Sequence, residues 1–293
     1  MKYICFGEVL FDCLPSGPVL GGAPLNVSYH LSMLNDEGWV LSALGKDELG
    51  DRAEKEIKEK GQSLSLITRV DEPTGRADIT LNNGDADYMF NYPCSWDVIS
   101  ISNDNLPKEV DLIYFGTLAQ RSEKSRKTLE NLLDSVKAKE VFFDVNIRKE
   151  FYSKEIILNG LIKSTILKMN EDELPVILSI AGINSEDYRK NVEKLADKYD
   201  LKYVIITKGG NGSEVYSSGS WTEVEVEKNV NVVDTVGAGD SLSAGFCHVL
   251  LKTRDEKKAL RIGSKIAGYV VTQRGAMPQY SESLVRDLSK LLD

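Results

Sequence analysis

The chain has 293 residues, of which 42% are hydrophobic and 28% are charged, and this composition excludes a disordered or membrane protein. The length allows one large domain or two unequal ones. The formal net charge of −9 argues against a nucleic-acid partner, because such partners require a basic face. No apolar run in the sequence is long enough to span a bilayer, so we expect no membrane association.

The cysteines and the N-terminal segment indicate the compartment. The four cysteines show neither a CxxC pair nor metal-ligand spacing, which is typical of reduced, mostly buried thiols. The N-terminal segment is apolar, but Glu8 and Asp12 interrupt it before a signal-peptide core is complete. We therefore expect a soluble, cytoplasmic protein. His30 and His248 lie among apolar residues of expected helices without a partner in sequence, which favours packing or surface positions over catalysis.

The first third of the chain is expected to mix strands and helices. The pattern predicts a strand at residues 3–7, a loop rich in Pro and Gly through residue 22, a helix opened by Pro24, a strand at residues 39–43 and a helix at residues 47–60. Gly61 occupies the position that commonly ends a helix. Alternating runs at residues 77–81 and 86–91 surround Asn83-Gly84, a strong hairpin signal.

From residue 111 onward, strands and helices alternate with short connections. The expected strands are 111–115, 141–145, 166–169 and 203–207, and the expected helices are 122–136, 154–163, 171–180 and 187–199. Such alternation predicts βαβ units and a mostly parallel sheet covered on both faces. The early hairpin does not fit this rhythm, so we expect it in a small β appendage over one edge. A hairpin at 213–216 and 222–226 precedes two helices, at 241–252 and 255–273.

Polar and glycine-rich segments follow several of these strands. They lie at residues 144–148, 170–173 and 207–212. In open parallel sheets, ligands bind beyond the carboxyl ends of the strands. The pattern therefore predicts a cleft built from several loops. For the segment from Thr207 to Gly212, a tight hairpin entry is an equally simple interpretation.

The segment Asp234-Thr-Val-Gly-Ala-Gly-Asp-Ser241 precedes an apolar helical run. Successive backbone N–H groups of Gly237, Ala238 and Gly239 can turn toward one anion, and the helix adds its positive N-terminal end. Asp240 lies in the first helical turn, where a carboxylate can also act only as a cap. The spacing matches neither the GxxxxGK[ST] loop nor GxGxxG. The residues alone predict a phosphate-binding helix terminus with a carboxylate of undecided role.

Two N-terminal features are compatible with a polar ligand. Gly21-Gly22-Ala23-Pro24-Leu25-Asn26 allows close backbone approach and offers an amide at a helix start, although a plain loop-to-helix junction fits as well. Asp12 follows the first expected strand. Its carboxylate could accept two sugar hydroxyls or cap a turn.

Taken together, these segments resemble the ribokinase-like (PfkB-type) carbohydrate kinase family over nearly the whole chain. Gly21–Asn26 resembles the N-terminal signature of this family and Asp234–Ser241 its C-terminal one, while Asn170-x-x-Glu173 and Thr207-x-Gly209-x-x-Gly212 match internal motifs. The first signature and residues 144–148 are most similar to the fructokinase branch. Ribokinases and 2-keto-3-deoxygluconate kinases share much of both segments.

The resemblance implies a single three-layer α/β/α domain over residues 1–293, with a mostly parallel sheet and a small β-sheet lid at about 14–22 and 74–93. It implies transfer of the γ-phosphoryl group of ATP to a hydroxyl of a small sugar, with D-fructose favoured. Mg²⁺ accompanies ATP; a K⁺ ion and a homodimer through the lid are left open.

The same resemblance assigns roles to individual residues. The implied roles are Asp240 as base, Gly237, Ala238 and Gly239 as anion hole, Asp12, Gly22, Asn26 and Arg148 as substrate-binding residues, Asn170, Thr207, Gly209 and Gly212 as nucleotide-binding residues, Glu173 as a water-mediated Mg²⁺ site, and the backbone at Asp234 and Thr235 as a possible monovalent-cation site.

Two other classes of protein are weighed against a kinase. A dinucleotide-binding oxidoreductase is disfavoured, because no GxGxxG follows the first strand with an acidic residue at the usual distance. A catalytically inactive sugar-sensing protein would be expected to lack Asp240 or the anion-hole glycines. All of these residues are present.

Overall fold

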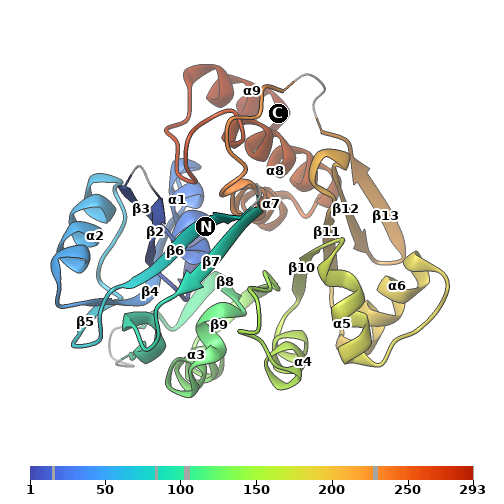
Figure 1. The fold of residues 1–293 in the computed structure, drawn as a ribbon. Coiled ribbons are helices and arrows are strands. Elements are labelled where there is room, and N and C mark those ends of the chain that lie inside the picture. The colour runs from blue at the N-terminus through green and yellow to red at the C-terminus, as the bar shows by residue number, and fades with distance from the viewer. Residues whose placement is uncertain (15–16, 83–84, 102–105, 227–229, 293) are drawn as a thin grey trace.

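The computed structural model describes residues 1–14, 17–82, 85–101, 106–226 and 230–292, which form two sheets with flanking helices (Figure 1). The large sheet has nine strands among the described residues. In spatial order they are β13 (Ser220–Val224), β12 (Ser213–Ser217), β11 (Tyr203–Thr207), β10 (Ile166–Asn170), β9 (Lys137–Asp144), β8 (Glu109–Gly116), β1 (Lys2–Phe6), β4 (Glu37–Gly45) and β5 (Ile67–Val70).

The large sheet is mostly parallel, as the alternation of strands and helices predicts. Every neighbouring pair from β5 to β11 is parallel. At the other edge, β12 pairs antiparallel with both β11 and β13. β1 lies between β4 and β8, so the chain winds outward from it in both directions. The carboxyl ends of the parallel strands therefore meet along one edge, where a ligand site is expected.

Helices cover both faces of the large sheet (Figure 1). They are α1 (Ala23–Met33), α2 (Glu48–Glu59), α3 (Glu123–Ser135), α4 (Lys154–Lys163), α5 (Glu173–Ala181), α6 (Tyr188–Tyr199), α7 (Ala238–Thr253), α8 (Glu256–Val270) and α9 (Glu282–Leu292), with short 3₁₀ helices η1 (Ser95–Val98), η3 (Leu118–Arg121) and η4 (Gly209–Asn211). The sequence pattern predicts all the longer helices except α9, and it does not predict β5.

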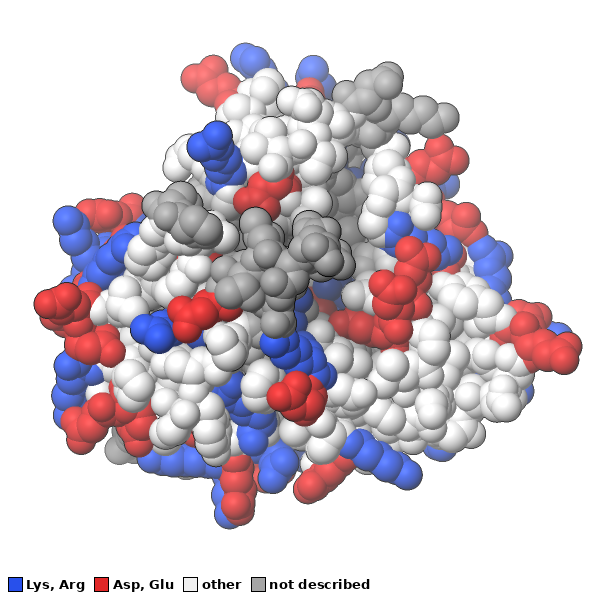
Figure 2. Space-filling model, in the orientation of Figure 1, with Lys and Arg blue, Asp and Glu red and all other residues white. Residues whose placement is uncertain are grey.

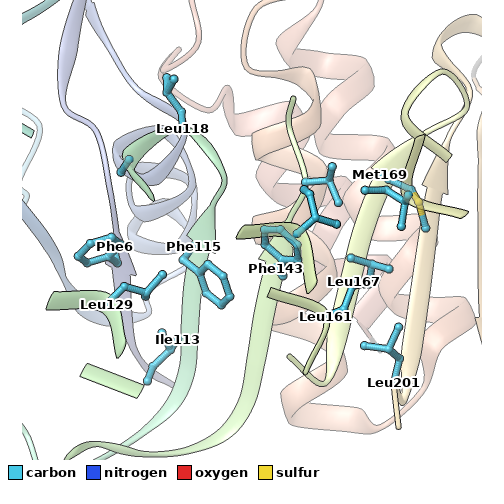
Figure 3. Packing of buried hydrophobic residues seen from close by; sticks show 14 of the residues in the cluster. Phe6, Ile113, Phe115, Leu118, Leu129, Phe143, Leu161, Leu167, Met169 and Leu201 are labelled. Atoms are coloured by element: carbon cyan, nitrogen blue, oxygen red, sulfur yellow. The ribbon is translucent and has the colours of Figure 1, made fainter. Parts of the chain in front are cut away.

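Two hydrophobic cores lie on opposite faces of the sheet, because successive side chains of a strand point to opposite sides. In β1, Ile4 and Phe6 pack toward α3, α4, α5 and α6, whereas Tyr3 and Cys5 pack toward α1, α7, α8 and α9. Figure 3 shows the first of these cores, where Phe115 stacks on Phe143 at 5.1 Å between ring centroids. Each fully buried side chain of this size contributes about 1.5–3 kcal/mol.

The small sheet consists of four strands in the order β3 (Gly17–Gly21), β2 (Leu10–Leu14), β6 (Gly75–Asn82) and β7 (Asp85–Phe90). β6 and β7 form the predicted hairpin, whose turn at residues 83–84 lies outside the described residues. The sequence pattern treats residues 8–22 as a loop, and this is wrong. Residues 10–14 and 17–21 form an antiparallel pair that joins β6 in parallel.

Helix ends follow the capping rules read from the sequence. The side chain of Asp47 accepts a hydrogen bond from the N–H of Gly50 at 2.7 Å and caps α2, while Gly61 follows the helix with a φ of 72°. Asp255 caps α8 in the same way, accepting from the N–H of Lys258. Across the part of the chain that the structure describes, no helix combines the length and the apolar character needed to cross a bilayer.

α7 and α8 approach closely because two glycines face each other. A Cβ atom at Gly245 would lie 2.9 Å from Cα of Gly263, and one at Gly263 would lie 2.6 Å from the carbonyl oxygen of Leu242. Neither separation is compatible with a side chain. The glycines therefore set the distance between α8 and α7, the helix that begins at the expected anion site.

Candidate active site

A cavity of about 330 Å³ opens at the carboxyl ends of the parallel strands, beside the small sheet. On the face drawn in Figure 2, acidic and basic side chains are interspersed over the surface. The lining residues are Glu8, Leu10, Asp12, Gly22, Ala23, Asn26, Phe90, Leu118, Asp144, Asn146, Arg148, Lys168, Asn170, Glu173, Thr207, Thr235, Val236, Gly237, Gly239 and Asp240. Segments far apart in the chain therefore meet at one cavity.

Asp240 lies in the first turn of α7 at the wall of this cavity. Its Oδ2 accepts a hydrogen bond of 2.8 Å from Nδ2 of Asn26, which lies in α1. Burial raises the pKa of Asp240 from 3.8 to about 6, and the charge of Asp144 adds to this rise, although Asn26, Lys168 and Arg148 oppose it. At neutral pH, Asp240 is therefore ionised and more basic than an ordinary aspartate.

The two glycines before Asp240 differ in backbone conformation and in the atoms that a Cβ would meet. Gly237 has a φ of 78°, in the left-handed region that favours glycine, and a Cβ there would lie 2.6 Å from Ala276. Gly239 has no positive φ, but a Cβ there would lie 3.3 Å from Nζ of Lys168. The N–H of Ala238 donates to the carbonyl of Thr235 at 3.3 Å, and Ala238 does not line the cavity.

Lys168 places a buried positive charge next to these glycines. Its Nζ lies 2.8 Å and 3.0 Å from the two carboxylate oxygens of Asp144, and the hydroxyl of Tyr114 donates to Asp144 at 3.0 Å. Burial lowers the pKa of Lys168, but the carboxylates of Asp144, Asp240 and Glu173 outweigh this effect, so that the pKa is raised overall. The ammonium is therefore charged, and it lies beside Gly239 while paired with Asp144.

A second pair of carboxylates lines the end of the cavity near the small sheet. Asp12 lies in β2, and a Cβ at Gly21 would lie 3.1 Å from its Oδ2. Burial raises the pKa of Asp12 to about 6 and that of Glu8 to about 7. The positive charge of Arg148 lowers both values, which indicates that these carboxylates share one cation.

Glu8 also lies against the start of α1. The backbone N–H groups of Glu8 and of Ala23, in the first turn of the helix, lower the pKa of its carboxylate, although burial outweighs them. Gly22 has a φ of 112°, and a Cβ there would lie 2.3 Å from the carbonyl oxygen of Glu8. The two segments are thus closely packed, and this contact fixes the helix that carries Asn26.

The expected nucleotide and metal residues lie at the other end of the cavity or next to it. Glu173 accepts the N–H of Ile147 at 2.7 Å with one carboxylate oxygen and that of Asn170 at 2.8 Å with the other. Glu173 thereby joins the loops after β9 and β10. Thr207 lines the cavity, whereas Gly209 and Gly212 do not.

Asp234 joins two loops next to the expected anion site. Its carboxylate accepts the N–H of Val236 at 3.0 Å and that of Gly275 at 3.0 Å. The segment after Gly275 is held in turn by α1, where Nε2 of His30 lies 2.9 Å from the carbonyl oxygen of Ala276. His30 is thus a packing residue as expected, but with hydrogen-bond partners that sequence reasoning missed. The same is true of His248, whose Nδ1 lies 2.6 Å from Asp36.

Sequence reasoning did not single out Lys168 or Glu8 for this cavity. A signal for Lys168 was present, because a lysine inside an otherwise apolar strand is almost never buried without a partner. Its partner Asp144 stands in a polar segment that the pattern had placed at a strand end. For Glu8, an acidic residue directly after the first strand and Gly7 was a comparable signal.

Comparisons with known proteins agree with this geometry. A family profile described as pfkB family carbohydrate kinase matches residues 18–283. An ATP-dependent 6-phosphofructokinase from Thermoanaerobacterium thermosaccharolyticum is 27% identical over 282 residues, covering 91% of this chain and 83% of the relative. A probable fructokinase-7 from Arabidopsis thaliana is 28% identical over 318 residues, covering 97% and 91%. A fructokinase from Xylella fastidiosa, solved with bound ATP, superimposes with a TM-score of 0.85 at 20% identity, covering 99% and 98%.

The fold is the three-layer ribokinase-like fold, with a large mostly parallel sheet and a small separate one. The chain belongs to the pfkB family of carbohydrate kinases, because the family profile spans most of its length. The resemblance noted from the sequence motifs is therefore confirmed.

Proposed function

We propose that the protein transfers the γ-phosphoryl group of ATP to a hydroxyl of D-fructose. The observation that carries the proposal is the position of Asp240, in one cavity with the polar residues Asp12 and Asn26 and with the glycines at the start of α7. A carboxylate suited to act as a general base, hydrogen-bond acceptors for sugar hydroxyls and the proposed anion site thus line the same space. These are the parts that phosphoryl transfer to a sugar hydroxyl requires.

In this proposal, Asp240 accepts the proton of the attacking hydroxyl. The hydrogen bond from Asn26 holds one carboxylate oxygen of Asp240 in place. The orientation of the whole carboxylate, including its other oxygen, is therefore set by a protein partner rather than by solvent. The transferring phosphoryl group carries negative charge on its equatorial oxygens. The N-terminal end of α7 at Gly237 and Gly239, together with the ammonium of Lys168, stabilises this charge without reorganising.

The nucleotide is proposed to lie along Asn170, Thr207, Gly209 and Gly212. Gly212 packs against Val224, since a Cβ there would lie 2.2 Å from its carbonyl oxygen. Val224 lines a second cavity of about 390 Å³ with Arg261 and Ser264 at its other walls, and we place the base of the nucleotide there.

Mg²⁺ is proposed to enter with the phosphates. Glu173 fits a water-mediated contact, because Mg²⁺ usually keeps several waters and takes only one or two carboxylates besides phosphate oxygens. When bound, the ion neutralises charge between the phosphates. A monovalent cation at the backbone of Asp234 and Thr235 remains part of the proposal, and a double mutant of a fructokinase from Vibrio cholerae was solved with fructose, ADP and potassium ion.

The charge of the cavity favours a neutral sugar over a phosphorylated or acidic one. Five carboxylates (Glu8, Asp12, Asp144, Glu173 and Asp240) and two cationic side chains (Arg148 and Lys168) line it among the described residues. Lys168 is paired with Asp144, and Arg148 lies among Glu8, Asp12 and Asp240. A phosphate or carboxylate on the acceptor would therefore meet net negative charge, which disfavours fructose 6-phosphate and 2-keto-3-deoxygluconate.

The test is ATP turnover with separate acceptors at equal concentration. The acceptors are D-fructose, D-ribose, fructose 6-phosphate, 2-keto-3-deoxygluconate and a nucleoside, and the expected order places D-fructose first in kcat/KM. A higher kcat/KM for any rival would replace the acceptor and leave the kinase proposal standing. An absence of ATP turnover with every acceptor would contradict the kinase proposal itself.

A further inference from the structure

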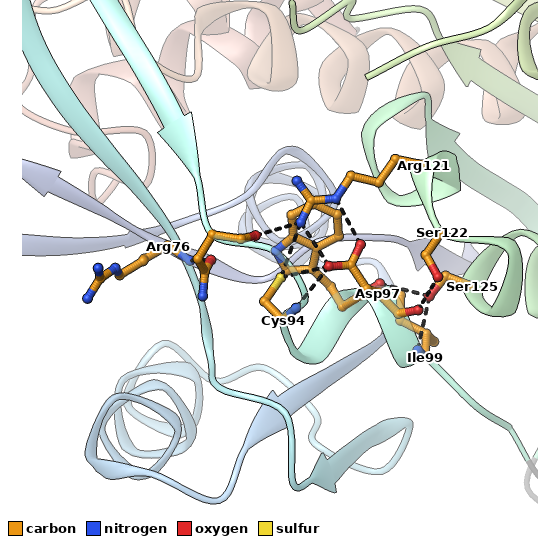
Figure 4. Close-up of polar contacts among 9 residues, drawn as sticks. Arg76, Cys94, Asp97, Ile99, Arg121, Ser122 and Ser125 are labelled. Atoms are coloured by element: carbon orange, nitrogen blue, oxygen red, sulfur yellow. Dashed lines mark hydrogen bonds and ion pairs between the residues drawn. The ribbon is translucent and has the colours of Figure 1, made fainter. Parts of the chain in front are cut away.

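A buried ion pair lies where the small sheet leaves the body of the molecule (Figure 4). Nε and Nη2 of Arg121 each lie 2.8 Å from a different carboxylate oxygen of Asp97, and the side chains are 4% and 3% exposed. Such a two-point pairing fixes the plane of the guanidinium as well as its position. Asp97 is fixed in turn, because its Oδ2 accepts the N–H of Cys94 at 2.9 Å.

Three aromatic rings enclose the same guanidinium. Its central carbon lies 3.7 Å from the ring centroid of Trp96, 4.9 Å from that of Phe151 and 5.1 Å from that of Tyr92. These distances are within the range of cation–π contacts. Arg121 is thus held by charge, by hydrogen bonds and by ring faces at once.

Arg121 connects this cluster to the apolar wall of the cavity. Its Nη2 donates to the carbonyl oxygen of Asn91 at 2.7 Å, and Asn91 directly follows Phe90 at the end of β7. The ring of Phe151 meets that of Phe90 edge-on at 5.8 Å. Leu118 begins the 3₁₀ helix that Arg121 ends. Phe90 and Leu118 both line the cavity, so one side chain touches the supports of both wall residues.

Asn91, which accepts the hydrogen bond from Arg121, also contacts the start of β6. Its Oδ1 accepts the N–H of Arg76 at 2.8 Å, and its Nδ2 donates to the carbonyl oxygen of Thr74 at 3.1 Å. Asn91 therefore joins the first residues of β6 to the end of β7. Through Asn91, Arg121 fixes the place where both strands of the hairpin leave the body.

We propose that Arg121 is a positioning residue for the acceptor: it sets the places of Phe90 and Leu118 against the sugar and the angle of the small sheet over it. This inference rests on the proposed sugar-kinase function. The pair is poorly explained by stability alone, because Nη1 of Arg121 and Nε1 of Trp96 are buried without a hydrogen-bond partner in the described part of the chain. Well-packed apolar residues often stabilise such a site at least as well as an ion pair. A guanidinium held by two carboxylate oxygens and three ring faces is instead restricted to one position and one orientation.

The test compares Arg121→Lys with Arg254→Lys in the full-length protein. Lysine keeps the charge but cannot make the two-point contact. Arg254 is the control, because its guanidinium also pairs with a buried carboxylate, Glu140, at 2.7 Å, but its side chain is half-exposed and lies at the opposite end of α7 from Asp240. We expect Arg121→Lys to raise the KM for the acceptor about tenfold or more, with a smaller change in kcat and in the KM for ATP. Arg254→Lys should leave the acceptor KM unchanged.

A second variant keeps the proposal testable if Arg121→Lys does not fold. Phe151→Leu removes the ring between Arg121 and Phe90 while leaving the ion pair intact, and it should raise the acceptor KM in the same direction. A folded Arg121→Lys or Phe151→Leu enzyme with the acceptor KM of the wild type would overturn the inference, as would equal changes in Arg121→Lys and Arg254→Lys. Wild-type turnover distinguishes a failure of the proposed function from a failure of the inference about Arg121. A wild-type protein that phosphorylates no acceptor would overturn both.

Discussion

Asn26 and Asp240 lie 214 positions apart in the chain and are joined by a hydrogen bond of 2.8 Å from Nδ2 to Oδ2. The other amide atom of Asn26, Oδ1, is buried without a hydrogen-bond partner among the described residues. An unsatisfied buried acceptor costs free energy, about 1–3 kcal/mol. A sugar hydroxyl donating to it would remove this cost on binding, so in the proposed mechanism this contact joins the acceptor site to the base.

Asp240→Asn should lower kcat by roughly 10²–10⁴, because the asparagine cannot accept the hydroxyl proton. The fold should remain, since the asparagine can still accept the hydrogen bond from Asn26. Steady-state kinetics and a binding measurement with ATP check this, and the affinity for ATP should be nearly unchanged. Turnover within a few-fold of the wild type would remove Asp240 from the mechanism.

The pH dependence of kcat should show an acidic limb near pH 6. Asp240 has a pKa of about 6 and acts as a base only when ionised, so the rate should fall about tenfold per pH unit below that value. Lys168 lowers this pKa, so Lys168→Met should move the limb to higher pH. Profiles are measured at saturating sugar and ATP. A limb that stays in place in Lys168→Met would show that another group is titrating.

Gly239→Val should lower kcat even at saturating sugar. A Cβ at this position would lie 3.3 Å from Nζ of Lys168, so a larger side chain must displace the ammonium and obstruct the approach of phosphate. Gly239→Ala should give a smaller loss in the same direction. If only the sugar KM rises in both variants, the glycines contact the acceptor and not the phosphoryl group.

Asp12→Ala should weaken the use of the sugar by about 2–4 kcal/mol in kcat/KM, since hydrogen bonds to a charged group contribute about 1.5–3 kcal/mol each. The affinity for ATP alone should hardly change, because Asp12 lies in β2 of the small sheet. Kinetics with D-fructose and calorimetry with ATP separate the two effects. Unchanged sugar kinetics would place the acceptor elsewhere.

Glu8→Gln should stabilise the protein at pH 8 but not at pH 4.5. The pKa of Glu8 rises from 4.5 to about 7 on folding, so the folded state favours the protonated carboxyl. The stability from this preference is present below pH 4.5 and is lost as the pH rises through 7. The variant, which cannot ionise, should therefore gain up to about 3 kcal/mol at pH 8. Urea unfolding at both pH values checks this, with Glu59→Gln, whose side chain is 61% exposed, as the control.

The parts of the fold that were predicted correctly are those with local signals. The charged helix after Asp47 has a capping residue at its start and Gly61 at its end, and both lie close in sequence. The strands β2 and β3 lack such a signal. β2 pairs with β6, which begins more than 60 residues later, and Gly and Pro dominate the pattern of β3. Pairing at that distance depends on tertiary contacts rather than on local preference.

In the candidate site, too, the features with a local sequence signal were predicted and those set by tertiary contacts were not. The motif before Ser241 predicted an anion site at a helix start, and the structure places that helix at the cavity. The motif could not tell that Gly237, and not Gly239, has the left-handed backbone. It also could not supply Lys168, because the pairing of Lys168 with Asp144 and its place over Gly239 depend on the order of β9 and β10 in the sheet.

The late position of α7 in the chain has a consequence for biosynthesis. β1 forms the middle of the sheet and is synthesised first, whereas α7, which packs against α1, is among the last helices to leave the ribosome. A nascent chain that has emerged only as far as β13 carries Asp12 and Asn26 but neither Asp240 nor the glycines at the start of α7. Under the proposed mechanism, phosphoryl transfer therefore begins only when synthesis is nearly complete.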